Sequence, residues 1–100
     1  MGKIVVIGDK YTVTLFKLLG TEAEEVSDPS IVDEIIRKYS KREDVDLVLL
    51  TQDLYQPARE KVEEVLKSMN KPIVSIIPSP FSEMKPLDVR KMIMQALGFG

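Results

Sequence analysis

The chain has 100 residues, 44% of them hydrophobic, and its 14 basic and 16 acidic side chains leave a formal net charge of −2. A chain of this size forms one domain around one core, and its nearly balanced charge argues against nucleic acid or an anionic membrane surface as a partner. Cysteine and histidine are both absent, which excludes disulfides, thiol nucleophiles, zinc sites with the usual ligands, and the side chain best suited to proton transfer near neutral pH.

The N-terminal stretch predicts a buried strand followed by an unusually apolar helix. Residues 3–7, "KIVVI", form the strand, and Gly8 and Asp9 separate it from the helix. The helix carries two apolar stripes: Tyr11, Leu15 and Leu18 in one, and Thr12, Phe16 and Leu19 in the other. One stripe is enough to pack on a sheet, so the second is either buried in the same domain or meets a partner, and both interpretations stay open. We interpret Asp9 as the N-cap of this helix.

The middle of the chain alternates between strands and amphipathic helices. A short strand over residues 23–26 precedes Asp28, which we predict to cap a helix whose first residue is Pro29. Strands over residues 45–50 and 71–77 are short apolar runs. The helix after Asp28 and a later one within "QPAREKVEEVLKSM" each place their apolar residues along one side: Ile31, Val32, Ile35, Ile36 and Tyr39 in the first, and Ala58, Val62, Val65, Leu66 and Met69 in the second.

This order of elements predicts an α/β fold with an open, doubly wound, four-stranded and mainly parallel sheet, similar to a truncated receiver or flavodoxin-like domain. Because three of the strands are almost continuously apolar, we expect both faces of those strands to be covered. We assign residues 1–77 to the sheet domain and residues 78–86, which contain three prolines and two serines, to a linker. Residues 87–100 form a C-terminal helix on that linker.

The predicted C-terminal helix is also more apolar than a single contact requires. It has two apolar faces, Val89, Ile93 and Ala96 on one and Leu87, Met94 and Leu97 on the other, with Met84 and Met92 nearby. Residues 81–100 carry a small excess of basic side chains: Lys85, Arg90 and Lys91 against Glu83 and Asp88. Such a helix either docks on a partner as an arm or closes the domain's own sheet, and we favour the arm.

In a sheet of this kind, ligands bind at the carboxyl ends of the strands, where the sequence places Asp9, Thr51 to Asp53, and Ser75 to Ser79. Glycine-rich motifs that hold phosphate groups are missing, because Gly8 stands alone. Asp9 and Asp53 resemble the acidic pocket of response-regulator receivers, but the pocket's second acid and its lysine are both missing here. A stand-alone receiver-like signalling or small-ligand-binding domain that uses Asp9 and Asp53 is therefore the alternative hypothesis. We expect no catalytic residue, no metal and no cofactor.

Three stretches, read in order, resemble the F subunit of the archaeal-type (A-type) and vacuolar-type (V-type) rotary ATPases: "VIGDKYTVTLFKLLG" (6–20), "VLLTQDL" (48–54) and "KPIVSIIPSP" (71–80). The resemblance covers essentially the whole chain, and it is specific because the three motifs keep their order and spacing. Leu15 and Leu19 depart from the pattern, since a glycine is expected before Phe16 and a small residue near the end of the helix.

The resemblance implies a component of the central stalk that is not an enzyme by itself. Such a component binds the coiled-coil D subunit, turns with it inside the A/B catalytic head, and helps couple ATP turnover to proton or sodium transport. It is expected at the cytoplasmic side of the membrane as a peripheral part of the complex, and no apolar stretch approaches the ~20 residues that direct insertion needs. From the motif positions and the apolar stripes, we expect the partner interface to contain Tyr11, Thr12, Phe16, Pro78, Phe81, Met84, Leu87, Arg90, Lys91, Met94 and Leu97.

Overall fold

The computed structural model describes residues 2–79, 91, 94–95 and 98. Four strands form one sheet: β1 (Lys3–Gly8), β2 (Glu22–Glu25), β3 (Val45–Thr51) and β4 (Ile73–Ile77). They lie in the order β2-β1-β3-β4, and each neighbouring pair is parallel. The predicted α/β fold with an open, four-stranded parallel sheet is therefore confirmed.

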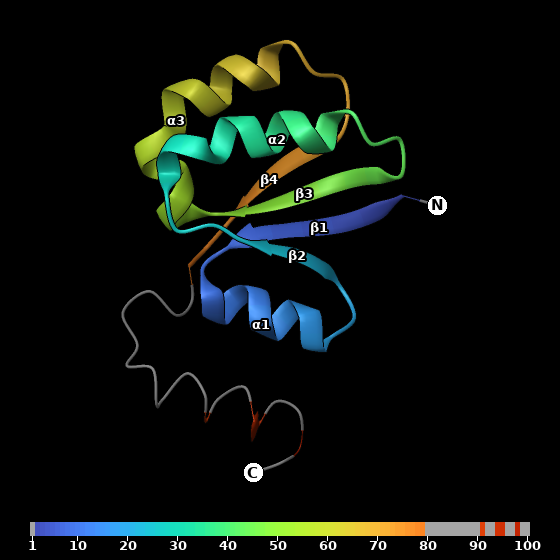
Figure 1. Cartoon of the computed structure of the whole chain (residues 1–100), viewed down its shortest axis with the longest axis vertical. Coiled ribbons are helices and arrows are strands. Elements are labelled where there is room, and N and C mark those ends of the chain that lie inside the picture. Colours follow the sequence, from blue (N-terminus) through green and yellow to red (C-terminus); the bar gives the residue numbers. More distant parts are fainter. Residues whose placement is uncertain (1, 80–90, 92–93, 96–97, 99–100) are drawn as a thin grey trace.

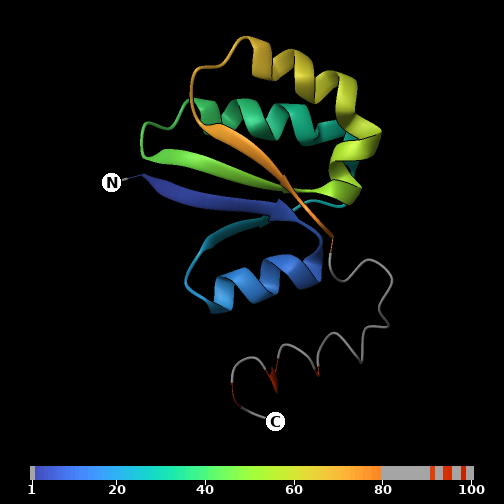
Figure 2. The ribbon, with the colours of Figure 1, turned by 180° about the vertical axis from the view of Figure 1, so that it is seen from behind.

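Helices lie on both faces of the sheet (Figures 1 and 2). On one face lies α1 (Lys10–Leu18), and on the other lie the 3-10 turn η1 (Pro29–Ile31), α2 (Val32–Ser40) and α3 (Gln52–Lys67). The chain passes from β1 to β2 at one edge and then crosses to β3 and β4, which is the doubly wound arrangement. Lys91, Met94 and Gln95 are helical, so a helix follows the sheet as predicted. Most of the predicted linker lies outside the described residues.

The hydrophobic core lies between the sheet and the layer formed by α2 and α3. Alternate residues of a strand point to the same face, and Val5, Ile7, Val48 and Leu50 direct fully buried side chains into this core. The helices contribute the buried residues Val32, Ile35, Ile36, Tyr39, Leu54, Ala58, Val62 and Val65. The amphipathic patterns in the sequence therefore identify the sides of α2 and α3 that face the sheet.

The start of α3 differs from the sequence prediction. The helix begins at Gln52, so Pro57 lies inside it instead of at its first turn. Proline at this position removes the one hydrogen bond that its missing N–H would donate to the Asp53 carbonyl. The additional turn buries Leu54, which is 4% exposed, in the core. Packing of that side chain offsets the lost hydrogen bond and extends the helix toward β3.

The helix predicted after Asp28 also begins later than expected. Residues 29–31 form η1, and α2 starts at Val32. Asp28 caps the 3-10 turn, because its Oδ1 accepts the backbone N–H of Ser30 at 2.9 Å. The hydrogen bond from this N–H lowers the pKa of the Asp28 carboxyl. The predicted cap residue therefore begins a short turn that leads into the helix.

The face of the sheet that carries α1 is only partly covered by residues 2–79. α1 packs on β1 and β2, and strand pairing places five apolar side chains on the same face farther along the sheet. We call these side chains the open face: Ile4, Leu47, Leu49, Ile73 and Ile77. Ile4 is 46% exposed and Ile73 is 69% exposed. The prediction that the apolar strands are covered on both faces is therefore wrong for β4.

Candidate functional site

The N-terminus of α1 is held by Asp9. Its Oδ2 accepts the backbone N–H groups of Tyr11 at 3.0 Å and Thr12 at 3.1 Å, and its Oδ1 accepts the Thr12 hydroxyl at 2.6 Å. These bonds satisfy two N–H groups that have no partner within the helix. Thr12 is 1% exposed. Its side chain therefore supports the cap and offers no surface to a partner.

Asp53, the second acid of the alternative hypothesis, lies in the first turn of α3. The Ser79 hydroxyl donates to its Oδ1 at 2.7 Å and accepts its backbone N–H at 2.9 Å. This reciprocal pair ties the chain after β4 to the N-terminus of α3. Among the residues that the structure describes, no three Asp, Glu, Cys or His side chains gather to hold a metal ion. Asp9 and Asp53 each have partners within the chain.

Thr51, the last residue of β3, has a fully buried hydroxyl with no hydrogen-bond partner among the described residues. Leaving such a group unsatisfied costs roughly 1–3 kcal/mol.

We expect Thr51→Val, which keeps the shape of the side chain and removes the hydroxyl, to raise the free energy of unfolding by about 1 kcal/mol. Urea unfolding followed by circular dichroism measures the change. Thr51→Ala is the control, and it should lower the free energy of unfolding because it also leaves a cavity. A Thr51→Val variant that is no more stable than the parent protein would contradict the prediction.

Both apolar stripes of α1 are only partly buried within the domain. Tyr11 and Phe16 are half-buried, whereas Leu18 and Leu19 are 52% and 62% exposed. We call these two leucines the α1 end. α1 lies on the opposite side of the sheet from α2 and α3 (Figure 1), and the strand register places the open face on the α1 side. Large apolar side chains grouped on one side of a small domain mark an interaction surface.

The remaining predicted interface residues belong to the C-terminal part of the chain. Pro78 and Lys91 are exposed, and Met94 is 44% exposed. The other predicted positions lie outside the described residues: Phe81, Met84, Leu87, Arg90 and Leu97. The described members of the set thus have accessible surface, with the exception of Thr12.

A polar cluster that the sequence analysis missed joins β2 to α2. Glu24 accepts hydrogen bonds from the Lys38 ammonium and the Tyr39 hydroxyl, each at 2.6 Å. Burial raises the pKa of Glu24, but the hydrogen bonds from Lys38 and Tyr39 outweigh it and the net pKa is lowered. Burial and the bond to Glu24 raise the pKa of Tyr39. These partners are 14 and 15 residues from Glu24 in the sequence, so local pattern alone does not reveal them.

Arg42 forms a second cluster at the edge of β2. Its guanidinium donates to Glu22 at 2.6 Å and to Asp44 at 2.8 Å. These hydrogen bonds lower the pKa of Glu22 and lower the pKa of Asp44 to about 2. These ion pairs link the start of β2 to the segment that enters β3.

The Arg42 cluster predicts an acid-dependent loss of stability. The two carboxyl groups have lowered pKa values in the folded state. Their contribution to the free energy of unfolding is therefore complete above the pKa values of the unfolded chain, and it is lost as the pH falls through the pKa values of the folded chain. We expect Arg42→Gln to lower the urea midpoint at pH 7, and we expect its difference from the parent protein to shrink as the pH falls toward 2. Urea unfolding at several pH values tests this, with Arg59→Gln on α3 as the charge-matched control. A difference between Arg42→Gln and parent that does not change with pH contradicts the prediction.

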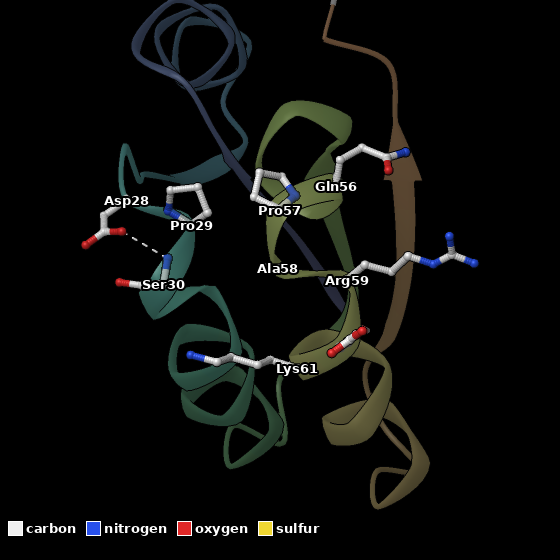
Figure 3. A pocket seen from close by; sticks show the side chains of 9 residues that line it. Asp28, Pro29, Ser30, Gln56, Pro57, Ala58, Arg59 and Lys61 are labelled. Atoms are coloured by element: carbon white, nitrogen blue, oxygen red, sulfur yellow. Dashed lines mark hydrogen bonds between the residues drawn. The ribbon is translucent and has the colours of Figure 1, made fainter.

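A shallow hollow lies between η1 and α3 (Figure 3). Its lining residues are Asp28, Pro29, Ser30, Gln56, Pro57, Ala58, Arg59, Glu60 and Lys61. The side chain of Lys61 extends toward η1, whereas Gln56 and Arg59 extend away from it. These polar groups do not converge on one point, so the hollow lacks the geometry of a catalytic or ion-binding site.

Comparison with known proteins identifies the family of the chain. The family model described as "ATP synthase (F/14-kDa) subunit" matches residues 4–93. The chain belongs to this family. It is 32% identical to the F subunit of the A-type ATP synthase of Methanothermobacter thermautotrophicus, over 95% of this chain and 92% of that relative. It is 33% identical to the F subunit of the A-type ATP synthase of Pyrococcus abyssi, over 96% of this chain and 94% of that relative.

Membership of this ATP synthase family confirms the resemblance carried by the three sequence motifs. It identifies the chain as a component of a rotary ATP synthase complex. None of the helices described here is both long and apolar enough to cross a membrane. The α1 end, with Leu18 and Leu19, and the open face, with Ile4 and Ile73, hold four of the large apolar side chains that residues 2–79 expose; Ile31 and Ile76 are exposed elsewhere.

Proposed function

We propose that the chain is a non-catalytic rotor component of the central stalk, which binds the coiled-coil D subunit and turns with it inside the A/B catalytic head. In this role it helps couple ATP turnover to proton or sodium transport. It acts at the cytoplasmic side of the membrane, as a peripheral part of the complex. The observation that carries the proposal is membership of the F-subunit family over residues 4–93.

The exposed apolar surfaces support this role. A rotor component needs a stable core and surfaces that bind its partner subunits. It needs no catalytic acid, catalytic base or metal ion. Helix α1 and the open face lie on the same side of the sheet. A coiled coil presents side chains along a straight, narrow surface, and burying apolar area against it contributes about 25 cal/mol per Å². Tyr11, Phe16, Pro78, Lys91 and Met94 complete the described part of the proposed interface.

The decisive experiment mixes the purified chain with the coiled-coil D subunit and determines the mass of the product by size exclusion with light scattering. We expect a stable one-to-one complex whose mass and stability do not depend on magnesium. Absence of a complex, together with a magnesium-dependent change in the free chain, would overturn the proposal. That result would instead favour the receiver-like alternative, in which Asp9 and Asp53 hold the ion.

The α1 end provides a test of the proposed interface at the level of side chains. We expect Leu18→Glu combined with Leu19→Glu to weaken binding to the D subunit by about tenfold or more, because two exposed apolar anchors become charged. Thr14→Glu combined with Lys10→Gln is the control on the same helix, since both side chains are exposed and the pair changes the net charge by the same two units. Titration calorimetry measures each affinity. Equal affinities for the two double variants would exclude the α1 end from the interface.

The arm hypothesis for the C-terminal helix is tested by truncation. We expect a chain that ends before Pro86 to bind the D subunit more weakly or to change the rate of ATP hydrolysis in a reconstituted A/B head. Thermal unfolding of the truncated chain shows whether the sheet domain is intact. An intact truncated chain with unchanged binding and unchanged hydrolysis rate removes the arm hypothesis.

A further inference from the structure

The two edge strands of the sheet are built differently. β2 has the sequence EAEE, and two of its three acidic side chains, Glu24 and Glu22, are paired with Lys38 and Arg42. Charges of this kind protect an edge strand from pairing with another chain. β4 has the sequence IVSII and carries no charge. Ile73 and Ile76 are 69% and 37% exposed, and among residues 2–79 β3 is the only strand that pairs with β4. The edge of β4 therefore lacks the protection that β2 has.

The sequence around β4 has nearly the same order of residue types when it is read in either direction. Residues 72–78 read "PIVSIIP", with Ser75 at the centre. When two such segments lie antiparallel with Ser75 opposite Ser75, each residue lies opposite a residue of the same type: proline opposite proline, serine opposite serine, and a β-branched apolar residue opposite another. The matched positions are Ile73 with Ile77, Val74 with Ile76, Ser75 with Ser75, and Pro72 with Pro78.

We propose that the β4 edges of two copies of this chain pair in antiparallel fashion about an axis through Ser75. In this pairing Ile73 and Ile77 meet on the side of the open face, and Val74 and Ile76 meet on the side of α3, because alternate residues of a strand share a face. The two sheets become one continuous sheet. The prolines at both ends have no N–H to donate, so they limit the new ladder to the five residues of β4.

The charge and exposure of β4 favour a second copy of the chain over a charged partner strand. Lys71, the nearest cation before the strand, is already paired with Asp46 at 2.7 Å. In the antiparallel pairing it meets Ser79 of the second copy, so no like charges face one another. Five-residue edges bury little area, and interfaces below about 1,200 Å² are weak. We expect a dimer whose population rises with protein concentration.

Because the chain contains no cysteine, single cysteines report the pairing directly. Residues opposite each other in an antiparallel pair have Cα atoms about 4.5–5.5 Å apart, within the range that a disulfide spans. We expect Ser75→Cys to form a disulfide-linked dimer under mild oxidation about tenfold faster than Ser27→Cys, an exposed control outside the sheet. Ile73→Cys alone should react slowly, and a mixture of Ile73→Cys and Ile77→Cys should react fast.

Sedimentation equilibrium of the full chain provides a second readout that needs no cysteine. We expect the parent protein to show a concentration-dependent dimer and Ile73→Lys to remain monomeric. Ile31→Lys is the matched control, because Ile31 is 40% exposed on η1, away from β4, and it should dimerise like the parent. A monomeric parent at every concentration, or Ser75→Cys linking no faster than Ser27→Cys, overturns the proposal. The experiment uses this chain alone, so its failure leaves binding to the D subunit unaffected.

Discussion

Replacing Gly8 with alanine is expected to lower the free energy of unfolding by about 3 kcal/mol, at the upper end of the usual cost of overpacking. A Cβ atom at this position would lie 2.7 Å from Cγ2 of Thr51. Thr51 is fully buried, and the two residues end the central strands β1 and β3. Something must therefore shift, and the buried, β-branched side chain of Thr51 has little freedom to rotate away. Urea unfolding of the Gly8→Ala variant measures the loss.

A double-mutant cycle tests whether the clash with Thr51 is the cause. Thr51→Ser removes the Cγ2 atom that the new Cβ would meet. We expect Gly8→Ala combined with Thr51→Ser to be more stable than the sum of the two single changes by about 1–2 kcal/mol, since neighbouring sites couple in this range. Additive losses would show that Gly8 is required for a reason other than its contact with Thr51.

Leu50→Ala is expected to lower the free energy of unfolding by about 3 kcal/mol, whereas Leu49→Ala should cost only about 1 kcal/mol. The two leucines are neighbours on β3 and undergo the same chemical change. Leu50 is fully buried in the core beneath α2 and α3, and Leu49 is half-buried on the open face. The difference therefore measures how unequally the two faces of the sheet are covered.

Thermal unfolding or urea unfolding of both variants gives the two values under identical conditions. Equal losses would mean that the open face is packed as tightly as the core in solution. That outcome would contradict the exposed apolar face on which part of the proposed interface with the D subunit rests. Addition of the D subunit should increase the difference between Leu49→Ala and the parent protein if the open face takes part in binding.

Several features were predicted correctly because they depend on interactions within a few residues. Asp9 accepts N–H groups two and three residues ahead of it, and this is the spacing that makes an N-cap recognisable in a sequence. The apolar side of α2 repeats with the period of a helix. Alternating strands and helices with short connections leave few topologies other than a parallel doubly wound sheet.

Other features depend on residues that only the folded chain brings together. The helix pattern alone places the start of α3 too late, because Pro57 is tolerated inside the helix where Leu54 packs into the core. The bonds from Lys38 and Tyr39 to Glu24 join β2 to α2 across the domain. The contact between Gly8 and Thr51 joins two strands that are adjacent in space and distant in sequence.

The open face and the edge of β4 show the same division most clearly. In the sequence, their apolar residues look like those of a strand that is covered on both faces, because the sequence shows that a side chain is apolar but not whether another element covers it. Exposure depends on which element covers it, and α1 packs on β1 and β2 instead of β3 and β4. The sequence by itself determined the family, the α/β class, the helix cap at Asp9 and the apolar character of the strands. The tertiary structure decided which of those apolar surfaces are buried, since burial arises from long-range packing that no local pattern contains.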